Sequence, residues 1–183
     1  HLTFGNNFNQ DVSSLPPSIT HLTFGNNFNQ DISVLPPFLT HLTLGDSFNQ
    51  DMSNLPSTLH HLTLSNELQK CDIPSSVKYL KLNCNNKFII DCLPNSIVEL
   101  ELGEDFNLEI NNLPTSIKIL RIDANSNYNM DLNCLPDFVE ELQLNIDYDT
   151  RILNIPPNLK KLTCCENYPY INDFMMCCNV QTY

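Results

Sequence analysis

The sequence predicts an elongated solenoid, a right-handed coil of about nine turns in which each turn takes up about 20 residues. Three observations support this fold class. The segment 20–31 recurs almost unchanged at 1–11 and at 40–51, a leucine marks the same point in every turn, and a proline recurs once per turn. In such architectures no turn can bury its apolar side alone, so neighbouring turns together supply the core.

The recurring leucines define the predicted strands. They are Leu2, Leu22, Leu42, Leu62, Leu80, Leu100, Leu120, Leu142 and Leu162. A second apolar residue follows two positions after each leucine, from Phe4 in the first turn to Cys164 in the last. Apolar residues at alternate positions are typical of a short strand with one buried face. Successive turns should therefore place parallel strands side by side, as a sheet on the concave face.

A Leu-Pro or Ile-Pro pair predicts the structure of the opposite side of each turn. The prolines are Pro16, Pro36, Pro56, Pro74, Pro94, Pro114, Pro136 and Pro156. Proline fixes φ, lacks an N–H group and disfavours helix in the residue before it. A 20-residue turn also lies at the short end of the range of roughly 20–29 for leucine-rich repeats. We therefore expect extended, polyproline-like segments without helices on the convex face.

The repeat also predicts the domain organisation. The solenoid should span 1–164, with turns at 1–20, 21–40, 41–60, 61–78, 79–98, 99–118, 119–140 and 141–160 and a partial turn at 161–164. The fourth turn is two residues short, the fifth moves its aromatic residue to Phe88, and the seventh should bulge near Asn127. Residues 165–183 lose the period and should form a C-terminal cap or tail. Because the sequence starts inside a repeat, we also expect further sequence before His1.

Composition restricts the class of partner. The formal net charge is −12, and the chain has nine lysines and arginines in total. This balance speaks against duplex nucleic acid or an anionic membrane as the main partner. The sequence has no apolar run long enough for a membrane-spanning helix. A protein partner is therefore expected.

The eight cysteines leave two interpretations open. None of them forms a Cys-x-x-Cys pair. Reduced thiols packed as small apolar side chains are the favoured interpretation, and disulfides, which would imply an oxidising compartment, are the alternative. A zinc site would have to use adjacent cysteines, which rarely reach the same tetrahedral metal. The cysteines are Cys71, Cys84, Cys92, Cys134, Cys164, Cys165, Cys177 and Cys178.

The repeated phrases resemble a known family. The pattern Phe-Asn-x-x-Ile/Val, Leu-Pro-x-Ser-Ile/Leu and Leu-x-Leu/Phe is clearest at 8–12, 28–32, 48–52 and 106–110. It resembles the FNIP repeat, a relative of leucine-rich repeats found in social amoebae and giant DNA viruses, over residues 1–164. The fourth and fifth turns depart from the pattern. The Leu-Pro-Pro-x-Leu phrase is also similar to the 20-residue leucine-rich repeats of bacterial effector proteins, whose turns lack a helix.

The resemblance implies two roles. Members of the FNIP group often carry an F-box, so the chain would be the substrate-recognition part of a ubiquitin ligase adaptor, although these residues contain no F-box. The alternative is a structural or particle-associated repeat protein of a giant virus. The first role implies an intracellular location, in the host cytoplasm if the protein is viral, and the second a virion-associated one.

One histidine per turn forms the most conspicuous chemical pattern. The outward position before the leucine is His1, His21, His41 and His61 in the first four turns, with Thr3, Thr23, Thr43 and Thr63 two positions later. Such a ladder could bind a metal or an anion, or respond to pH. A single ancestral histidine copied with its repeat is the simpler interpretation. Metal sites also need carboxylates that orient the rings, so added Zn²⁺ is expected to leave the melting temperature unchanged, and a rise of several degrees would contradict this.

Two other columns are predicted to be structural. The asparagine after the aromatic residue should bond backbone groups at a bend; it is Asn9, Asn29, Asn49, Asn107 and Asn129. The acidic column, Asp11, Asp31, Asp51, Glu109 and Asp131, lacks the glycine-rich loop of calcium sites. Phosphate-binding loops, nucleophile elbows and Cys/His pairs at a recognisable spacing are also missing from the sequence. The sequence therefore predicts a protein that is not an enzyme, with no cofactor and no bound metal.

The outward strand positions predict where a partner binds. The inward ladders persist along the whole chain, whereas the outward columns change in type after residue 78. This contrast favours partner contacts on the concave face of the second half, and drift on a solvated surface is the alternative. The candidate residues are His21, Thr23, His41, Thr43, His61, Tyr79, Lys81, Glu99, Glu101, Arg121, Glu141 and Gln143. The identity of the partner and the oligomeric state stay open.

Overall fold

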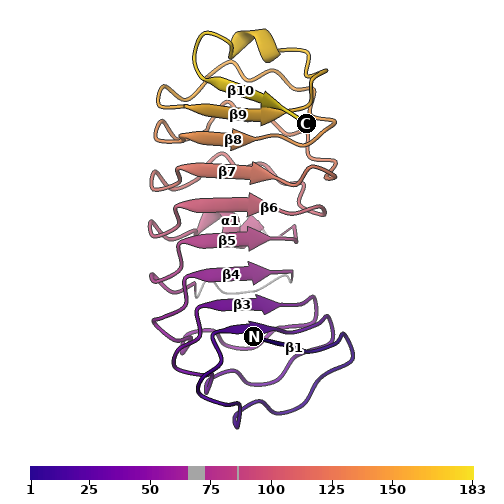
Figure 1. Cartoon of the computed structure of the whole chain (residues 1–183), viewed down its shortest axis with the longest axis vertical. Helices are drawn as coiled ribbons and strands as arrows, with labels where there is room; N and C mark the ends of the chain where they lie inside the picture. The colour runs from indigo at the N-terminus through magenta and orange to yellow at the C-terminus, as the bar shows by residue number, and fades with distance from the viewer. Residues whose placement is uncertain (66–72, 86) are drawn as a thin grey trace.

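The computed structural model describes residues 1–65, 73–85 and 87–183 and consists of one stack of turns with a parallel sheet on one side (Figure 1). Its ten strands follow one another in sequence order, which confirms the predicted solenoid class. The strands are β1 (Leu2–Thr3), β2 (His21–Thr23), β3 (His41–Leu44), β4 (His61–Leu64), β5 (Tyr79–Leu82), β6 (Glu99–Leu102), β7 (Ile119–Ile122), β8 (Glu141–Gln143), β9 (Lys161–Cys164) and β10 (Asn179–Thr182).

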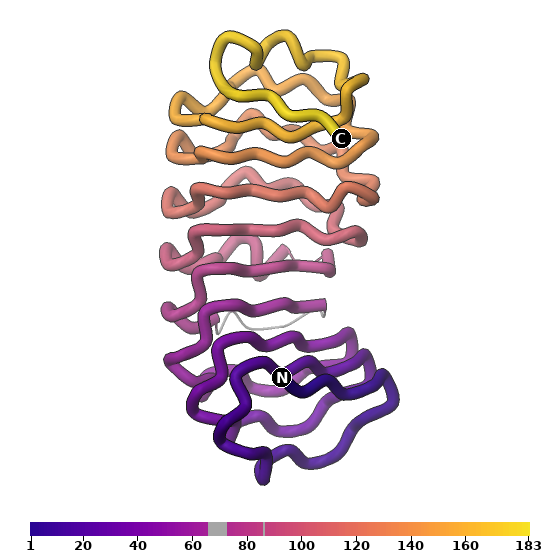
Figure 2. Tube along the Cα trace, in the orientation of Figure 1, coloured from indigo at the N-terminus to yellow at the C-terminus, as the bar shows by residue number. Residues whose placement is uncertain are grey.

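The recurring leucines align in register across the sheet. Leu22 pairs with Leu42, Leu62 with Leu80, and Leu120 with Leu142. These pairs span turns of different length, yet the strands stay aligned from one end of the stack to the other (Figure 2). Differences in turn length are therefore absorbed outside the strands, and the side chains of equivalent positions form straight columns.

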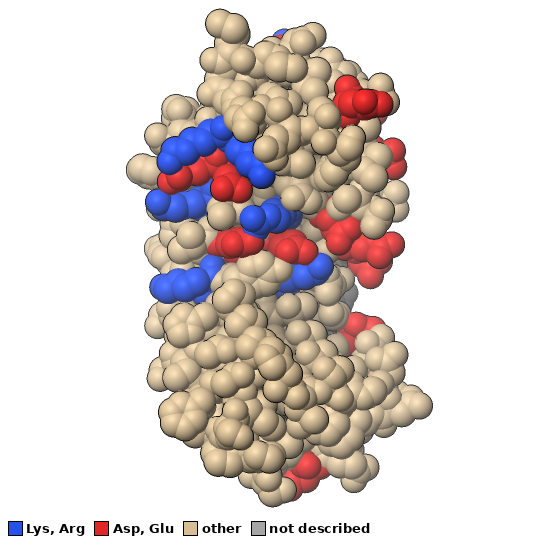
Figure 3. Space-filling model, in the orientation of Figure 1, with Lys and Arg blue, Asp and Glu red and all other residues tan. Residues whose placement is uncertain are grey.

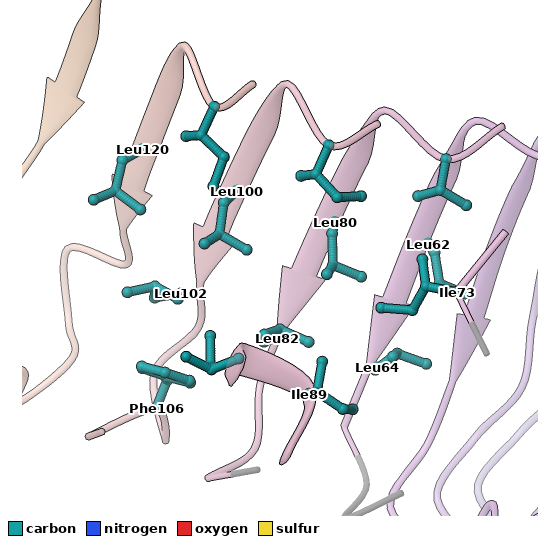
Figure 4. Packing of buried hydrophobic residues seen from close by; sticks show 14 of the residues in the cluster. Leu62, Leu64, Ile73, Leu80, Leu82, Ile89, Leu100, Leu102, Phe106 and Leu120 are labelled. Carbon is teal, nitrogen blue, oxygen red and sulfur yellow. The ribbon is translucent and has the colours of Figure 1, made fainter. Parts of the chain in front are cut away.

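The core lies between the sheet and the backs of the turns. Leu80, Leu100 and Leu120 are fully buried and stack on one another from neighbouring strands (Figure 4). In the first turns phenylalanine rings of neighbouring turns stack in the same way, with ring centroids 6.1 Å apart for Phe8 and Phe28 and 6.2 Å apart for Phe28 and Phe48. Each turn thus completes the apolar layer of the next, as expected for a repeat architecture.

The expectation of no helix on the convex side is wrong in the fifth turn. The short helix α1 (Lys87–Asp91) occupies this side. Because a helix rises 1.5 Å per residue and a strand about 3.3 Å, this segment spans less of the turn than extended chain would. Ile89 and Ile90 are fully buried, and Ile89 points into the core next to the strand leucines (Figure 4). Phe88 does not take the aromatic position, since its side chain is 52% exposed.

The asparagine column bonds the backbone from turn to turn, as the sequence predicts. The Asn29 N–H group donates to Asn9 Oδ1 at 2.9 Å, and the Asn49 N–H group donates to Asn29 Oδ1 at 2.8 Å. Gln50 Nε2 donates to the same Asn29 oxygen at 2.9 Å. Asn9 and Asn29, like Asn129 in the seventh turn, therefore supply an acceptor for a backbone donor that the strand ladder leaves unpaired at the bend.

The acidic column acts within its own turn. Asp11, Asp31 and Asp131 each accept a hydrogen bond from the backbone N–H group two residues later, at 3.1, 2.8 and 2.6 Å. The Ser13 hydroxyl and N–H groups lower the pKa of Asp11 in this way. These carboxylates thus close Asx turns, a role that the local sequence alone explains.

The segment around Asn127, where the sequence predicts a bulge, packs against the eighth turn. Asn127 is exposed between the buried side chains of Ser126 and Tyr128. Asn145 Nδ2 donates to the Ser126 carbonyl at 2.8 Å and joins this segment to the eighth turn. The Tyr128 hydroxyl is buried and has no hydrogen-bond partner among the described residues.

The C-terminal segment contains a strand that the sequence analysis did not predict. Strand β10 extends the sheet and pairs Val180 with Leu162. Before it, Tyr168 and Phe174 are buried on either side of the 3-10 helix η1 (Ile171–Asp173). The strand escaped prediction because valine replaces leucine at the marker position, although 162 to 180 repeats the spacing of 62 to 80.

Candidate functional site

The outward-pointing side chains of β1–β10 form the surface that we call the sheet face. All twelve candidate residues lie on it, in two columns that run across the strands. Figure 3 shows that the two ends of this face differ: over the first turns acidic side chains are seen only toward the margin, whereas acidic and basic side chains gather over the later turns. The sheet face therefore has an uncharged half and a charged half.

Stacked imidazole rings form the uncharged half. The ring centroids are 3.7 Å apart for His1 and His21, 3.9 Å for His21 and His41, and 4.0 Å for His41 and His61. Tyr79 of β5 ends the stack, tilted and 5.3 Å from His61. The strand register sets this arrangement, because it places one histidine of each turn directly beside the next.

Neighbouring threonines determine which ring nitrogen of neutral His41 carries the proton. The Thr40 hydroxyl donates to the Thr20 carbonyl at 3.0 Å, which uses its single proton. His41 Nδ1 lies 2.9 Å from the same hydroxyl oxygen, so Nδ1–H is the donor there. The neutral ring thus keeps its lone pair on Nε2.

Burial and mutual proximity disfavour the charged form of these rings. Burial is the largest cause that lowers the pKa of His41, and His61 and His21 add to it. Burial followed by His60 lowers the pKa of His61. Within the described ranges no group of three or more His, Cys, Asp or Glu residues could hold a metal ion.

Ion pairs between strands form the charged half. Lys81 Nζ lies 2.7 Å from a Glu101 carboxylate oxygen, and the Tyr79 hydroxyl donates to the other oxygen at 2.6 Å. Arg121 forms an ion pair with Glu99. Burial and the bond to Glu101 raise the pKa of Tyr79, so this phenol stays protonated.

Next to these ion pairs, over β7–β9, the sheet face has a shallow depression. Glu141 and Gln143 of β8 and Lys161 of β9 line a depression with Arg121, above the buried Leu142. The predicted residues of the second half therefore form one continuous surface across β5–β8, and β9 extends it.

The charges of the sheet face balance. Lys81, Arg121 and Lys161 oppose Glu99, Glu101 and Glu141, so three positive and three negative side chains sum to zero while the chain carries −12. Sequence reasoning did not include Asp123, which approaches Lys81 Nζ at 3.9 Å. Asp123 was missed because it follows the strand and lies outside both columns.

The described cysteines occupy different surroundings. Cys164 is fully buried in the inward ladder of β9, and burial raises the pKa of its thiol to about 11. Cys134 and Cys177 are exposed. Cys71 lies outside the described residues. Cys164 therefore packs as a small apolar side chain.

The chain is similar to a known repeat family and to solved structures. The crystal structure of the giant-virus protein CroV588, described as a novel circular LRR protein structure, superposes with a TM-score of 0.70 at 40% sequence identity. The match covers 90% of this chain and 26% of that chain, so the present chain spans about a quarter of its length. No curated protein matches. Among the described helices, none has the length and apolar character needed to cross a membrane.

The family assignment rests on the repeats themselves. The model of the FNIP repeat matches residues 1–27, 11–37, 28–67, 65–105 and 85–125, which together cover about two thirds of the chain. These residues include the strands β1–β7 and the asparagine bonds between the first three turns. The chain therefore belongs to the FNIP repeat family.

Proposed function

We propose that this chain is a non-catalytic protein-binding module whose charged half of the sheet face contacts the partner. The observation that carries the proposal is the contrast between the two sides of the strands. The inward side keeps leucine or a similar residue from β2 to β9, whereas the outward side changes in type from Tyr79 onward. Extended surfaces of this kind are the usual binding sites of solenoid proteins.

The ion pairs of this face suit recognition of a protein surface. Their side chains are one fifth to one third exposed, for example 26% for Lys81 and 31% for Arg121. Ion pairs at a surface contribute only about 0–1 kcal/mol each. A partner with complementary charges would therefore replace these ion pairs with little loss of free energy. Because positive and negative side chains alternate on the face, a surface with a different arrangement of charges would be repelled.

Family resemblance supports the first cellular role, substrate recognition in an F-box-type ubiquitin ligase adaptor. The F-box would lie in sequence outside these residues. The second role, a structural or particle-associated protein of a giant virus, is favoured by the 40% identity to CroV588. The first role implies the cytoplasm, of the host if the protein is viral, and the second implies the virion.

Affinity capture with matched variants tests the binding face. One variant carries Tyr79→Ala, Lys81→Ala, Glu101→Ala and Arg121→Ala. The control carries Lys87→Ala and Asp91→Ala, which removes an exposed ion pair on the opposite side of the fifth turn. Circular dichroism and melting curves establish that both variants keep the solenoid.

The expected result is that the wild-type chain and the control capture the same proteins from a lysate of the producing cells, and that the fourfold variant loses them. Ubiquitin ligase subunits among the captured proteins would favour the adaptor role, and co-sedimentation with particles the structural role. Capture by the folded fourfold variant at the wild-type level would refute the charged half as the binding face.

A further inference from the structure

The histidine stack differs from the rest of the sheet face in its response to acid. Three consecutive ring contacts, at 3.7, 3.9 and 4.0 Å, join the first four turns. At these distances two protonated rings repel each other, because neither is separated from the next by water or by a counter-charge. The stack can thus hold its geometry only while adjacent rings are neutral.

The groups around the stack supply no counter-charge. On the same strands its neighbours are threonines, such as Thr23 and Thr43, and the bend before β4 adds another histidine, His60. On β5 the stack meets the Tyr79 phenol, and Lys81 stands beside Thr63.

The carboxylates on the strand after β5 are already engaged. They belong to Glu99 and Glu101 of β6, which pair with Arg121 and Lys81. Among the described residues of the sheet face, no acidic side chain is thus placed to stabilise charged rings.

We propose that the stack of His1, His21, His41 and His61 makes the first four turns an acid-sensitive unit, which loosens from the rest of the solenoid as the pH falls below neutrality. The later turns carry no histidine and keep their packing. The inference concerns the stability of the turns and does not depend on the identity of a partner.

The loss of stability at low pH follows from the linkage between protonation and folding. The unfolded chain binds protons at the ordinary histidine pKa of about 6.5, whereas the folded rings of His41 and His61 have a lowered pKa. Folding is therefore most favourable above about pH 6.5, where both states are neutral. Stability is lost as the pH falls from about 6.5 toward the folded values, because the unfolded state then binds more protons.

Hydrogen exchange followed by mass spectrometry measures the local stability of each turn at a given pH. Peptides from 1–64 and from 99–164 are compared at pH 7.5 and pH 5.5, after correction for the intrinsic rate of exchange. The test variant carries His21→Gln, His41→Gln and His61→Gln, which keeps polar side chains without a titratable charge. A single-site variant, His60→Gln, removes an exposed histidine that belongs to no ring contact of the stack but contributes to the lowered pKa of His41 and His61.

The expected result is a loss of protection of about tenfold or more in 1–64 at pH 5.5, with 99–164 unchanged. The His60→Gln variant should keep a pH response that is weaker than that of the wild type, because burial, the larger cause of the lowered pKa of His41 and His61, remains. The triple variant should lose the pH response. Equal protection of 1–64 at both pH values, or a pH response that persists in the folded triple variant, would overturn the proposal.

A second measurement covers the case in which the triple variant does not fold. In the wild-type chain, nuclear magnetic resonance follows the ring protons of each histidine during a titration. His41 and His61 are expected to titrate below the value of free histidine. Titration at or above about pH 6.5 would overturn the proposal.

Discussion

Two glycines in identical local sequences provide a direct test of how the turns pack. Gly5 and Gly25 occupy the same place in segments 1–11 and 21–31, whose sequences are identical. A Cβ atom on Gly25 would lie 2.6 Å from the Cα atom and 2.7 Å from the backbone nitrogen of Asn6. At Gly5 a Cβ atom would meet nothing within 4 Å. Within residues 1–183 a turn packs before Gly25 and none packs before Gly5, so the comparison is made with a chain that begins at His1.

The structure gives the size of the expected effect. A methyl group forced against backbone atoms costs about 1–3 kcal/mol. Replacing glycine by alanine also restricts the unfolded chain, which stabilises the folded state by about 0.4–1 kcal/mol. Gly25→Ala should therefore lower the free energy of unfolding by about 1–2 kcal/mol, and Gly5→Ala should raise it by about 0.4–1 kcal/mol. Because the local sequences are the same, the unfolded-state contribution cancels when the variants are compared.

Urea unfolding followed by circular dichroism measures both variants against the wild type. The midpoint reports stability as long as the slope of the transition is unchanged. Equal midpoints for Gly5→Ala and Gly25→Ala would refute the reasoning, because the contact with Asn6 would then carry no cost. Gly45→Ala serves as a further control and should resemble Gly25→Ala, since its Cβ atom would lie 2.5 Å from the Gly25 carbonyl oxygen.

Three further predictions concern the bends and the core. Asn29→Ala should lower the free energy of unfolding by about 1 kcal/mol or more, because its oxygen accepts two hydrogen bonds from the next turn; urea unfolding measures this. Tyr148→Phe should cost about 1 kcal/mol through the lost bond to a backbone carbonyl at 3.0 Å, whereas Tyr128→Phe, whose hydroxyl is buried without a described partner, should be neutral or stabilising; equal losses in the same assay would contradict this. Cys164 should resist alkylation at pH 8, because its pKa of about 11 keeps the thiol protonated, while exposed Cys134 reacts; mass spectrometry of the labelled chain decides between them.

Much of the fold follows from the sequence because each signal recurs once per turn. The leucine ladder predicts the strands and their register. Because the alternating apolar pattern repeats at a nearly constant period, only one register places the leucine of each strand beside the leucine of the next. The exceptions lie where the signal changes its residue type. Val180 replaces leucine in β10, and within α1 the buried apolar residues are Ile89 and Ile90 rather than an aromatic residue. In both places the apolar character persists, so a search by polarity rather than by residue identity would have found them.

The candidate site was less predictable from sequence. Column positions identified the residues that face outward, because alternation along a strand fixes the side of the sheet. The pairing of Arg121 with Glu99, and of Lys81 with Glu101, depends on rotamers and on contacts across β5–β7. The proton arrangement of His41 likewise depends on Thr40 and on the carbonyl of the preceding turn. These contacts join residues that lie about one turn apart in the sequence and become neighbours only when the strands pair.

The constant register of the first three turns also has a genetic consequence. Segments that are nearly identical in sequence recombine readily, and a crossover between them removes or adds whole repeats. Leu22, Leu42 and Leu62 stand at equivalent heights in the stack, so the turns on either side of such a junction would meet the same apolar layer and the same asparagine bonds. Alleles with different repeat numbers would therefore encode folded proteins of different length, with the charged half unchanged and only its distance from the N-terminal end altered.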